Sequence, residues 1–103
     1  MIKIISLECG KDIEFVLGTA IEFIAILNTD KPQAVTISIT DPTNSQTVTD
    51  VEMTRLNSKI YSYIYQSASV YNSGLYVATV SATNGGYTTI RQLEFELSDP
   101  LPI

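Results

Sequence analysis

Residues 73–82 read Ser73-Gly74-Leu75-Tyr76-Val77-Ala78-Thr79-Val80-Ser81-Ala82. From Tyr76 onward, one set of alternate positions holds Tyr, Ala and Val, and the other set holds Val, Thr and Ser. Successive side chains of a β-strand point to opposite faces, so this two-residue period predicts a strand with one face in a core. Asn84-Gly85 follows. Both residue types accept the positive φ of a tight hairpin turn, so a second strand over 92–97 is expected to return alongside the first.

The same period recurs in both directions from this segment. Its clearest copy is Val35, Ile37 and Ile39, which alternate with Thr and Ser. Further strands are expected over 2–7, 14–17, 21–27 and 59–66, with weaker edge pieces over 46–51 and 53–56. The chain has 13 Ile, 7 Val and 12 Thr, nearly a third of its residues, and β-branched side chains favour sheets. No stretch has a sustained helical period. The pattern predicts an all-β sandwich of about seven antiparallel strands.

Length and charge limit the organisation and the partners. The 103 residues suffice for one domain, which we place at residues 1–98, with an extended tail at 99–103 that contains two prolines. The net charge is −5, without the Lys and Arg cluster that nucleic acid binding needs. No apolar run approaches the roughly 18 residues of a membrane span. Ser6 and Glu8 interrupt the first apolar run, so we expect no signal peptide and synthesis in a reducing cytoplasm.

The reactive residues are few. The chain has no His and a single Cys, Cys9, which excludes an internal disulfide and leaves no imidazole to activate a nucleophile. Glu94 and Glu96 share a strand face, which suits acid–base chemistry but fits a solvated face better. Gly85-Gly86 is better explained by a hairpin than by phosphate binding. We expect no enzyme activity, no cofactor, no metal and no small-molecule substrate. Calcium is the weaker alternative, because no calcium-loop spacing relates the three loop aspartates, which are Asp41, Asp50 and Asp99.

Three tyrosines, Tyr61, Tyr63 and Tyr65, occupy one face of the strand expected over 59–66. Facing outward, they would form a platform for a sugar or a protein; facing inward, they would belong to the core. In the second case, isoleucines would lie on the outer surface beside the strand over 21–27, which is apolar on both faces. Either arrangement leaves one sheet surface too apolar for a solitary monomer.

The segment Gly74-Leu75-Tyr76-Val77-Ala78 resembles the tyrosine corner of immunoglobulin-like sandwiches, with Gly74, Tyr76 and Ala78 at its defining positions. The turn over 39–44 is similar to that of bacterial immunoglobulin-like modules. The resemblance covers about residues 13–98. It implies an immunoglobulin-like β-sandwich without a disulfide, an inward row of tyrosines, and a Tyr76 hydroxyl bonded to nearby backbone. Because the Cys pair and the core Trp are missing, the chain does not resemble an antibody domain.

The overall layout is similar to small immunoglobulin-like accessory proteins of tailed-phage and archaeal-virus particles. That resemblance implies a non-enzymatic structural protein of the virion, a capsid decoration or a tail or neck component, bound in many copies after synthesis in the host cytoplasm. Its expected partners are a capsid or tail protein and copies of itself. The alternative is a spacer or adhesion module of a prokaryotic surface protein. The terminal segments 1–7 and 99–103 are the candidate assembly contacts, and within them Ile2, Ile4, Leu101 and Ile103.

Overall fold

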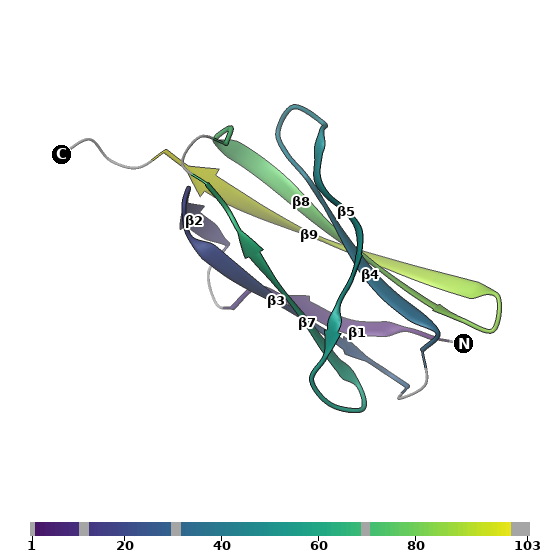
Figure 1. Cartoon of the computed structure of the whole chain (residues 1–103). Helices are drawn as coiled ribbons and strands as arrows, with labels where there is room; N and C mark the ends of the chain where they lie inside the picture. The colour runs from purple at the N-terminus through teal and green to yellow at the C-terminus, as the bar shows by residue number, and fades with distance from the viewer. Residues whose placement is uncertain (1, 11–12, 30–31, 69–70, 100–103) are drawn as a thin grey trace.

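The computed structural model describes residues 2–10, 13–29, 32–68 and 71–99, and these form two β-sheets (Figure 1). The first sheet has the order β1 (Ile4–Glu8), β3 (Ala20–Leu27), β7 (Ile60–Gln66), β6 (Thr54–Arg55). The second has the order β2 (Glu14–Val16), β9 (Tyr87–Ser98), β8 (Gly74–Asn84), β4 (Ala34–Thr40), β5 (Gln46–Glu52). In this part of the chain, no helix is long and apolar enough to cross a membrane.

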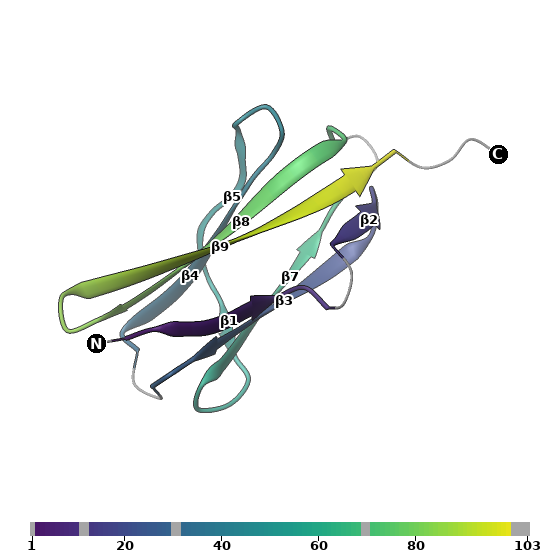
Figure 2. The same ribbon diagram turned by 180° about the vertical axis from the view of Figure 1, so that it is seen from behind.

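The predicted β-sandwich without a disulfide is confirmed, with nine described strands instead of about seven. One pairing differs from the expected antiparallel arrangement. β2 runs parallel to β9, with Glu14 opposite Glu96 and Val16 opposite Ser98. β1 belongs to the first sheet and β2, the next strand along the chain, belongs to the second. The two strands run in the same direction as β9, so β2 pairs with β9 in parallel (Figure 2).

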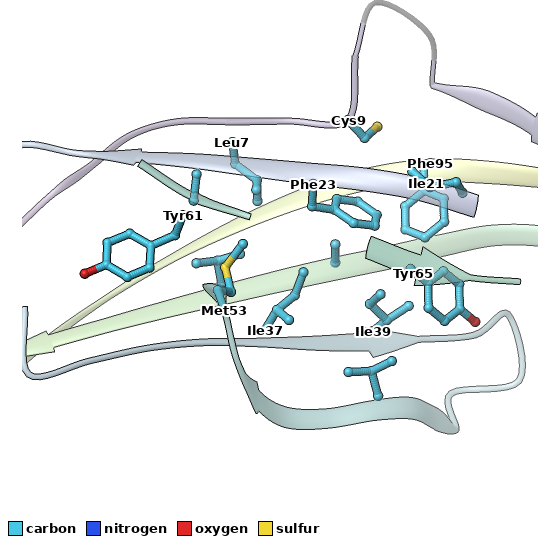
Figure 3. Close-up of a cluster of buried hydrophobic side chains, with 14 of the residues drawn as sticks. Leu7, Cys9, Ile21, Phe23, Ile37, Ile39, Met53, Tyr61, Tyr65 and Phe95 are labelled. Carbon is cyan, nitrogen blue, oxygen red and sulfur yellow. The ribbon is translucent and has the colours of Figure 1, made fainter. Parts of the chain in front are cut away.

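The core lies between the sheets and uses the alternate positions that the sequence predicts. Phe95 on β9 is its centre, with ring centroids 5.2 Å from Phe23, 5.5 Å from Tyr76 and 6.5 Å from Tyr65. Figure 3 shows side chains of both sheets meeting in this space. The contacts of Phe95 with Phe23 and Tyr65 are edge-to-face, and aromatic contacts of this kind add to the stabilisation that burial alone provides. The other side chains no more than 2% exposed include Ile21, Ala25, Leu27, Ile37, Ile39, Ala78, Val80, Ala82 and Leu97.

The row of tyrosines on β7 faces inward. Tyr61 and Tyr65 are buried, and the half-buried Tyr63 packs against the core. The Tyr65 hydroxyl lies 3.1 Å from the Thr47 hydroxyl, so its polar end has a partner at the sheet margin. The sequence allowed the tyrosines to face either outward or into the core, and in the structure they face the core. Ile64, at an alternate position of the same strand, therefore points outward with 62% of its surface exposed.

β8 and β9 form the longest hairpin. Asn84 pairs with Tyr87, so the two turn residues are Gly85 and Gly86, with φ of 60° and 82°. The turn therefore lies one residue later than Asn84-Gly85 predicted. Positive φ at both central positions is the requirement of a tight hairpin turn, and two glycines meet it without strain. The hairpin tip lies at the opposite end of the elongated molecule from the end of β9 (Figure 1).

Candidate functional site

The tyrosine that begins the inner face of β8 is fixed at both ends. The Tyr76 ring is fully buried beside Phe95, and its hydroxyl donates a hydrogen bond of 2.6 Å to the Asn72 carbonyl oxygen. Burial raises the pKa of this hydroxyl to about 12. This is the backbone bond that the resemblance implies for Tyr76. It ties the loop before β8 to the core.

The other two residues of this segment have packing roles. Gly74 has a φ of 134°, and a Cβ there would lie 2.9 Å from Cγ of Pro42. Only glycine lets the turn between β4 and β5 approach the start of β8 this closely. Ala78 is fully buried between the sheets, opposite Ile39 on one side and Leu93 on the other.

The turn that packs on Gly74 is organised by Asp41. One carboxylate oxygen of Asp41 accepts hydrogen bonds from the Thr43 hydroxyl at 2.6 Å, the Thr43 amide at 2.8 Å and the Ser45 amide at 3.0 Å. The Thr43 hydroxyl is the main reason that the pKa of Asp41 lies below its ordinary value of 3.8. Because this oxygen is occupied by the turn itself, the arrangement gives Asp41 a structural role.

The other acidic residues considered from the sequence are dispersed. Glu94 and Glu96 lie exposed on the outer face of β9, opposite Val77 and Leu75. Among the described residues, no three His, Cys, Asp or Glu side chains come close enough to hold a metal ion. Asp50 pairs with Ser38 across β4 and β5, and Asp99 accepts a hydrogen bond of 3.3 Å from the Ser73 hydroxyl.

The candidate assembly contacts fall in different places. Ile2 and Ile4 are only 3% and 7% exposed, because β1 lies beneath β9 and Arg91 donates hydrogen bonds to the Ile4 and Ile5 carbonyl oxygens. These two side chains therefore pack in the core of their own chain, and of the two only Ile2 also lines the hollow at the hairpin end. Leu101 and Ile103 lie outside the described residues.

A hollow of about 540 Å³, which the sequence did not predict, opens at the hairpin end. It is lined by Ile2, Asn84, Gly85 and Tyr87 and is mostly apolar. Tyr87 is 64% exposed, and it belongs to the inner face of the hairpin because it is opposite Asn84 in the ladder. The hairpin extends past the first sheet (Figure 1), and Ile2 lines the hollow beside it. Neither the reach of the hairpin nor the position of Ile2 can be predicted from the local sequence.

A second exposed apolar surface covers the outer face of the first sheet. We define this isoleucine face as Ile24, Ile26, Ile60 and Ile64. The ladder places Ile26 directly opposite Ile60 and places Ile24 and Ile64 on the same face of the sheet. Ile64 is 62% exposed and the other three are half-buried. The sequence anticipated this surface from the two-sided apolar pattern of residues 21–27.

Comparison with known proteins supports the fold and leaves the function open. No family model and no curated protein matches the chain. An endo-β-1,4-mannanase from Thermotoga petrophila has a similar structure, with a TM-score of 0.67 and 15% identity over 92% of this chain. A DUF4785 family protein from Legionella pneumophila is similar with a TM-score of 0.61 and 13% identity over 86% of this chain. The chain spans only 19% and 26% of their lengths.

Proposed function

We propose that this chain is a non-enzymatic structural protein with an immunoglobulin-like fold, a rigid module bound in many copies to a larger protein assembly. The assembly that we favour is a virus particle, with the chain as a capsid decoration or as a tail or neck component. The observation that carries the proposal is the isoleucine face, four isoleucines gathered on one side of the first sheet. In the part of the chain that the structure describes, no strand or loop covers this face (Figures 1 and 2).

The physical argument rests on the cost of leaving this face in water. Each Å² of apolar surface removed from water contributes about 25 cal/mol, so a partner that covers the face gains free energy in proportion to the area. Contiguous apolar patches on soluble proteins commonly mark interaction sites. Glu22 lies opposite Ile64 and Glu8 opposite Ile24, so acidic groups border the patch. A partner with an apolar surface bordered by Lys or Arg fits this arrangement.

The virion is favoured by the resemblance of the layout to small immunoglobulin-like accessory proteins of phage and archaeal viruses. The corner around Tyr76, Asn72 and Gly74 supports that resemblance, because it fixes the loop before β8 to the core through a side chain–backbone bond. The acidic net charge of −5 is compatible with a protein that contacts other proteins and not nucleic acid.

The test uses two isoleucines with the same exposure on different sheets. Ile64 and Ile90 are both 62% exposed, and Ile90 lies on the outer face of the second sheet, opposite Ser81. Tagged wild-type chain is expected to co-purify in many copies with assembled particles, and Ile64→Glu is expected to abolish incorporation. Ile90→Glu should incorporate normally. Absence of the wild-type chain from particles, or equal loss in both variants, would contradict the proposal.

A spacer module of a larger surface protein is the second candidate. The structural similarities favour it, because in both matched proteins the similar region is a minor part of a longer chain. Antibodies against the purified domain would distinguish the two functions. A spacer would be detected at the cell surface within a polypeptide much larger than 11.3 kDa, whereas an accessory protein would be detected in particles at that mass.

A further inference from the structure

The two ends of the sandwich carry opposite charge. Lys3 and Lys59 flank the end of β3, since the Lys3 carbonyl accepts a hydrogen bond from Asn28 and the Lys59 carbonyl accepts one from Leu27. Arg91 lies at the same end, where it bonds the carbonyl oxygens of β1. We call this the basic end, and it also holds the hollow beside Ile2. The Arg55 side chain donates hydrogen bonds to the Asn57 and Ser58 carbonyl oxygens, in the turn that precedes Lys59. Glu52 on β5, opposite Thr36, is an acidic residue in the same half of the molecule.

The opposite end is acidic. Glu14 and Glu96 lie directly opposite each other in the ladder between β2 and β9. Asp99 follows β9 by one residue and is held by Ser73, and Asp41 lies in the turn that packs on Gly74. We call this the acidic end. The tail, residues 99–103, begins here and continues as Leu101-Pro102-Ile103, an apolar sequence with a proline that lowers the entropy lost when an extended segment binds.

The tail cannot fill the hollow of its own chain. The hollow is lined by Tyr87 and the tail follows Ser98, which are the two ends of β9. Eleven residue steps along a strand cover about 36 Å. The tail is attached at the far end, and residues 99–103 can span at most about 18 Å even when fully extended. An apolar segment at one end and an apolar hollow at the other therefore require two molecules to meet.

We propose that copies of this chain associate head to tail, with the tail of one copy, through Leu101 and Ile103, bound in the hollow formed by Ile2, Asn84, Gly85 and Tyr87 of the next. The basic end then faces the acidic end of its neighbour, and Lys3 comes near Asp99. The proposal deepens the proposed structural role and rests on it for the premise that copies lie side by side in one assembly.

A second copy is the occupant that the charges favour. A generic apolar peptide would fill the hollow without using the positive charge of this end, whereas the acidic end of another copy would bring carboxylates toward it, first of all toward Lys3, which adjoins Ile2 in the chain. In such a contact the tail of one copy meets the hollow of the next, so a pair of copies still has one free tail and one free hollow. Further copies can therefore be added, and the result is a closed ring or an open filament. A tail of a few residues buries little area, so single contacts are weak and depend on high local concentration.

Sedimentation velocity of the purified chain over a range of concentrations tests the proposal. The wild type is expected to form oligomers that grow with concentration. High salt should weaken them, because the Debye length falls from about 30 Å at 0.01 M to about 8 Å at 0.15 M. Tyr87→Ser in the hollow and the double change Leu101→Ser with Ile103→Ser in the tail should each raise the dissociation constant at least about tenfold. Ile90→Ser is the matched control, because its side chain is similarly exposed but lies on the opposite face of the hairpin from Tyr87, and it should associate like the wild type.

Mixing the two defective variants makes the test specific for a head-to-tail contact. The tail variant keeps an intact hollow and the hollow variant keeps an intact tail, so the mixture should form dimers and nothing larger. Circular dichroism melting of each variant verifies that the sandwich is folded. A wild type that stays monomeric at every concentration, variants that associate like the wild type, or a mixture that stays monomeric would each overturn the proposal. Particles that incorporate a strictly monomeric chain would refute only the head-to-tail contact, and a self-associating chain absent from particles would refute only the proposed function.

Discussion

Removal of one oxygen atom, by Tyr76→Phe, tests whether the corner stabilises the sandwich. The ring of Tyr76 is fully buried, and its hydroxyl donates to the Asn72 carbonyl oxygen at 2.6 Å. Phenylalanine keeps the ring contact with Phe95 and removes only the hydrogen bond. A net intramolecular hydrogen bond contributes about 1 kcal/mol, so we expect a loss of about 1 kcal/mol at neutral pH. In a domain of this size that lowers Tm by about 4–8 °C.

The pH dependence of this difference has a definite sign. The pKa of Tyr76 is raised from 10.0 to about 12 in the folded chain, so its contribution is fully present below pH 10 and is lost as the pH rises through about 12. That rise corresponds to at most about 2.7 kcal/mol, which exceeds the roughly 1 kcal/mol that the hydrogen bond contributes at neutral pH. Phenylalanine does not titrate. The advantage of the wild type over Tyr76→Phe should therefore shrink to about zero between pH 10 and about 12.

Urea unfolding of both proteins across this pH range measures the difference directly. The other tyrosines, including Tyr65, whose pKa burial also raises, are present in both proteins and cancel in the comparison. Tyr87→Phe is the control, because Tyr87 is 64% exposed and should lose nothing measurable. Equal stability of wild type and Tyr76→Phe at neutral pH, or a difference that stays constant up to pH 12, would refute the structural role of the corner.

Three further changes probe the parts around this corner. Gly74→Ala should destabilise by about 1–3 kcal/mol in urea unfolding, because φ is 134° and the new Cβ would lie 2.9 Å from Pro42; an unchanged midpoint would show that the turn can move away. Phe95→Ala should cost about 3–5 kcal/mol, since it empties the centre of the core, and a loss below about 2 kcal/mol would mean that the core collapses into the space. Asp41→Asn should lower Tm at neutral pH, because the carboxylate that accepts the Thr43 hydroxyl is lost. That difference should vanish well below pH 3.8, where the wild-type carboxyl is protonated, and a difference that persists in acid would contradict this account.

Alternation in the sequence predicted the faces of most strands correctly. In β4 and β8 every expected core residue is buried, because a two-residue period assigns side chains to faces without reference to the rest of the fold. The position of Tyr76 also predicted its backbone bond, since the residues of the corner are adjacent in sequence. Local features of this kind need no knowledge of which strands are neighbours.

Features that depend on the pairing of distant strands could not be predicted in this way. The parallel pairing of β2 with β9 depends on where the chain changes sheets, and only three residue pairs define it. The burial of Ile2 depends on a hairpin more than eighty residues later, and the hollow beside Tyr87 depends on how far that hairpin projects. The hairpin turn at Gly85-Gly86 differs from the prediction by one residue, because the cross-strand register decides which of two possible dipeptides forms the turn.

The corner and the start of the tail are connected at the acidic end. Tyr76 holds the Asn72 carbonyl, and the next residue, Ser73, donates its hydroxyl to Asp99, the first residue of the tail. The hydrogen bond that stabilises the fold therefore also fixes the loop that holds the start of the tail. A binding segment whose starting point is fixed loses less entropy when it binds than one attached to a mobile loop. The sandwich thus holds the first residue of the tail at one end and the hollow at the other, as the proposed head-to-tail contact requires.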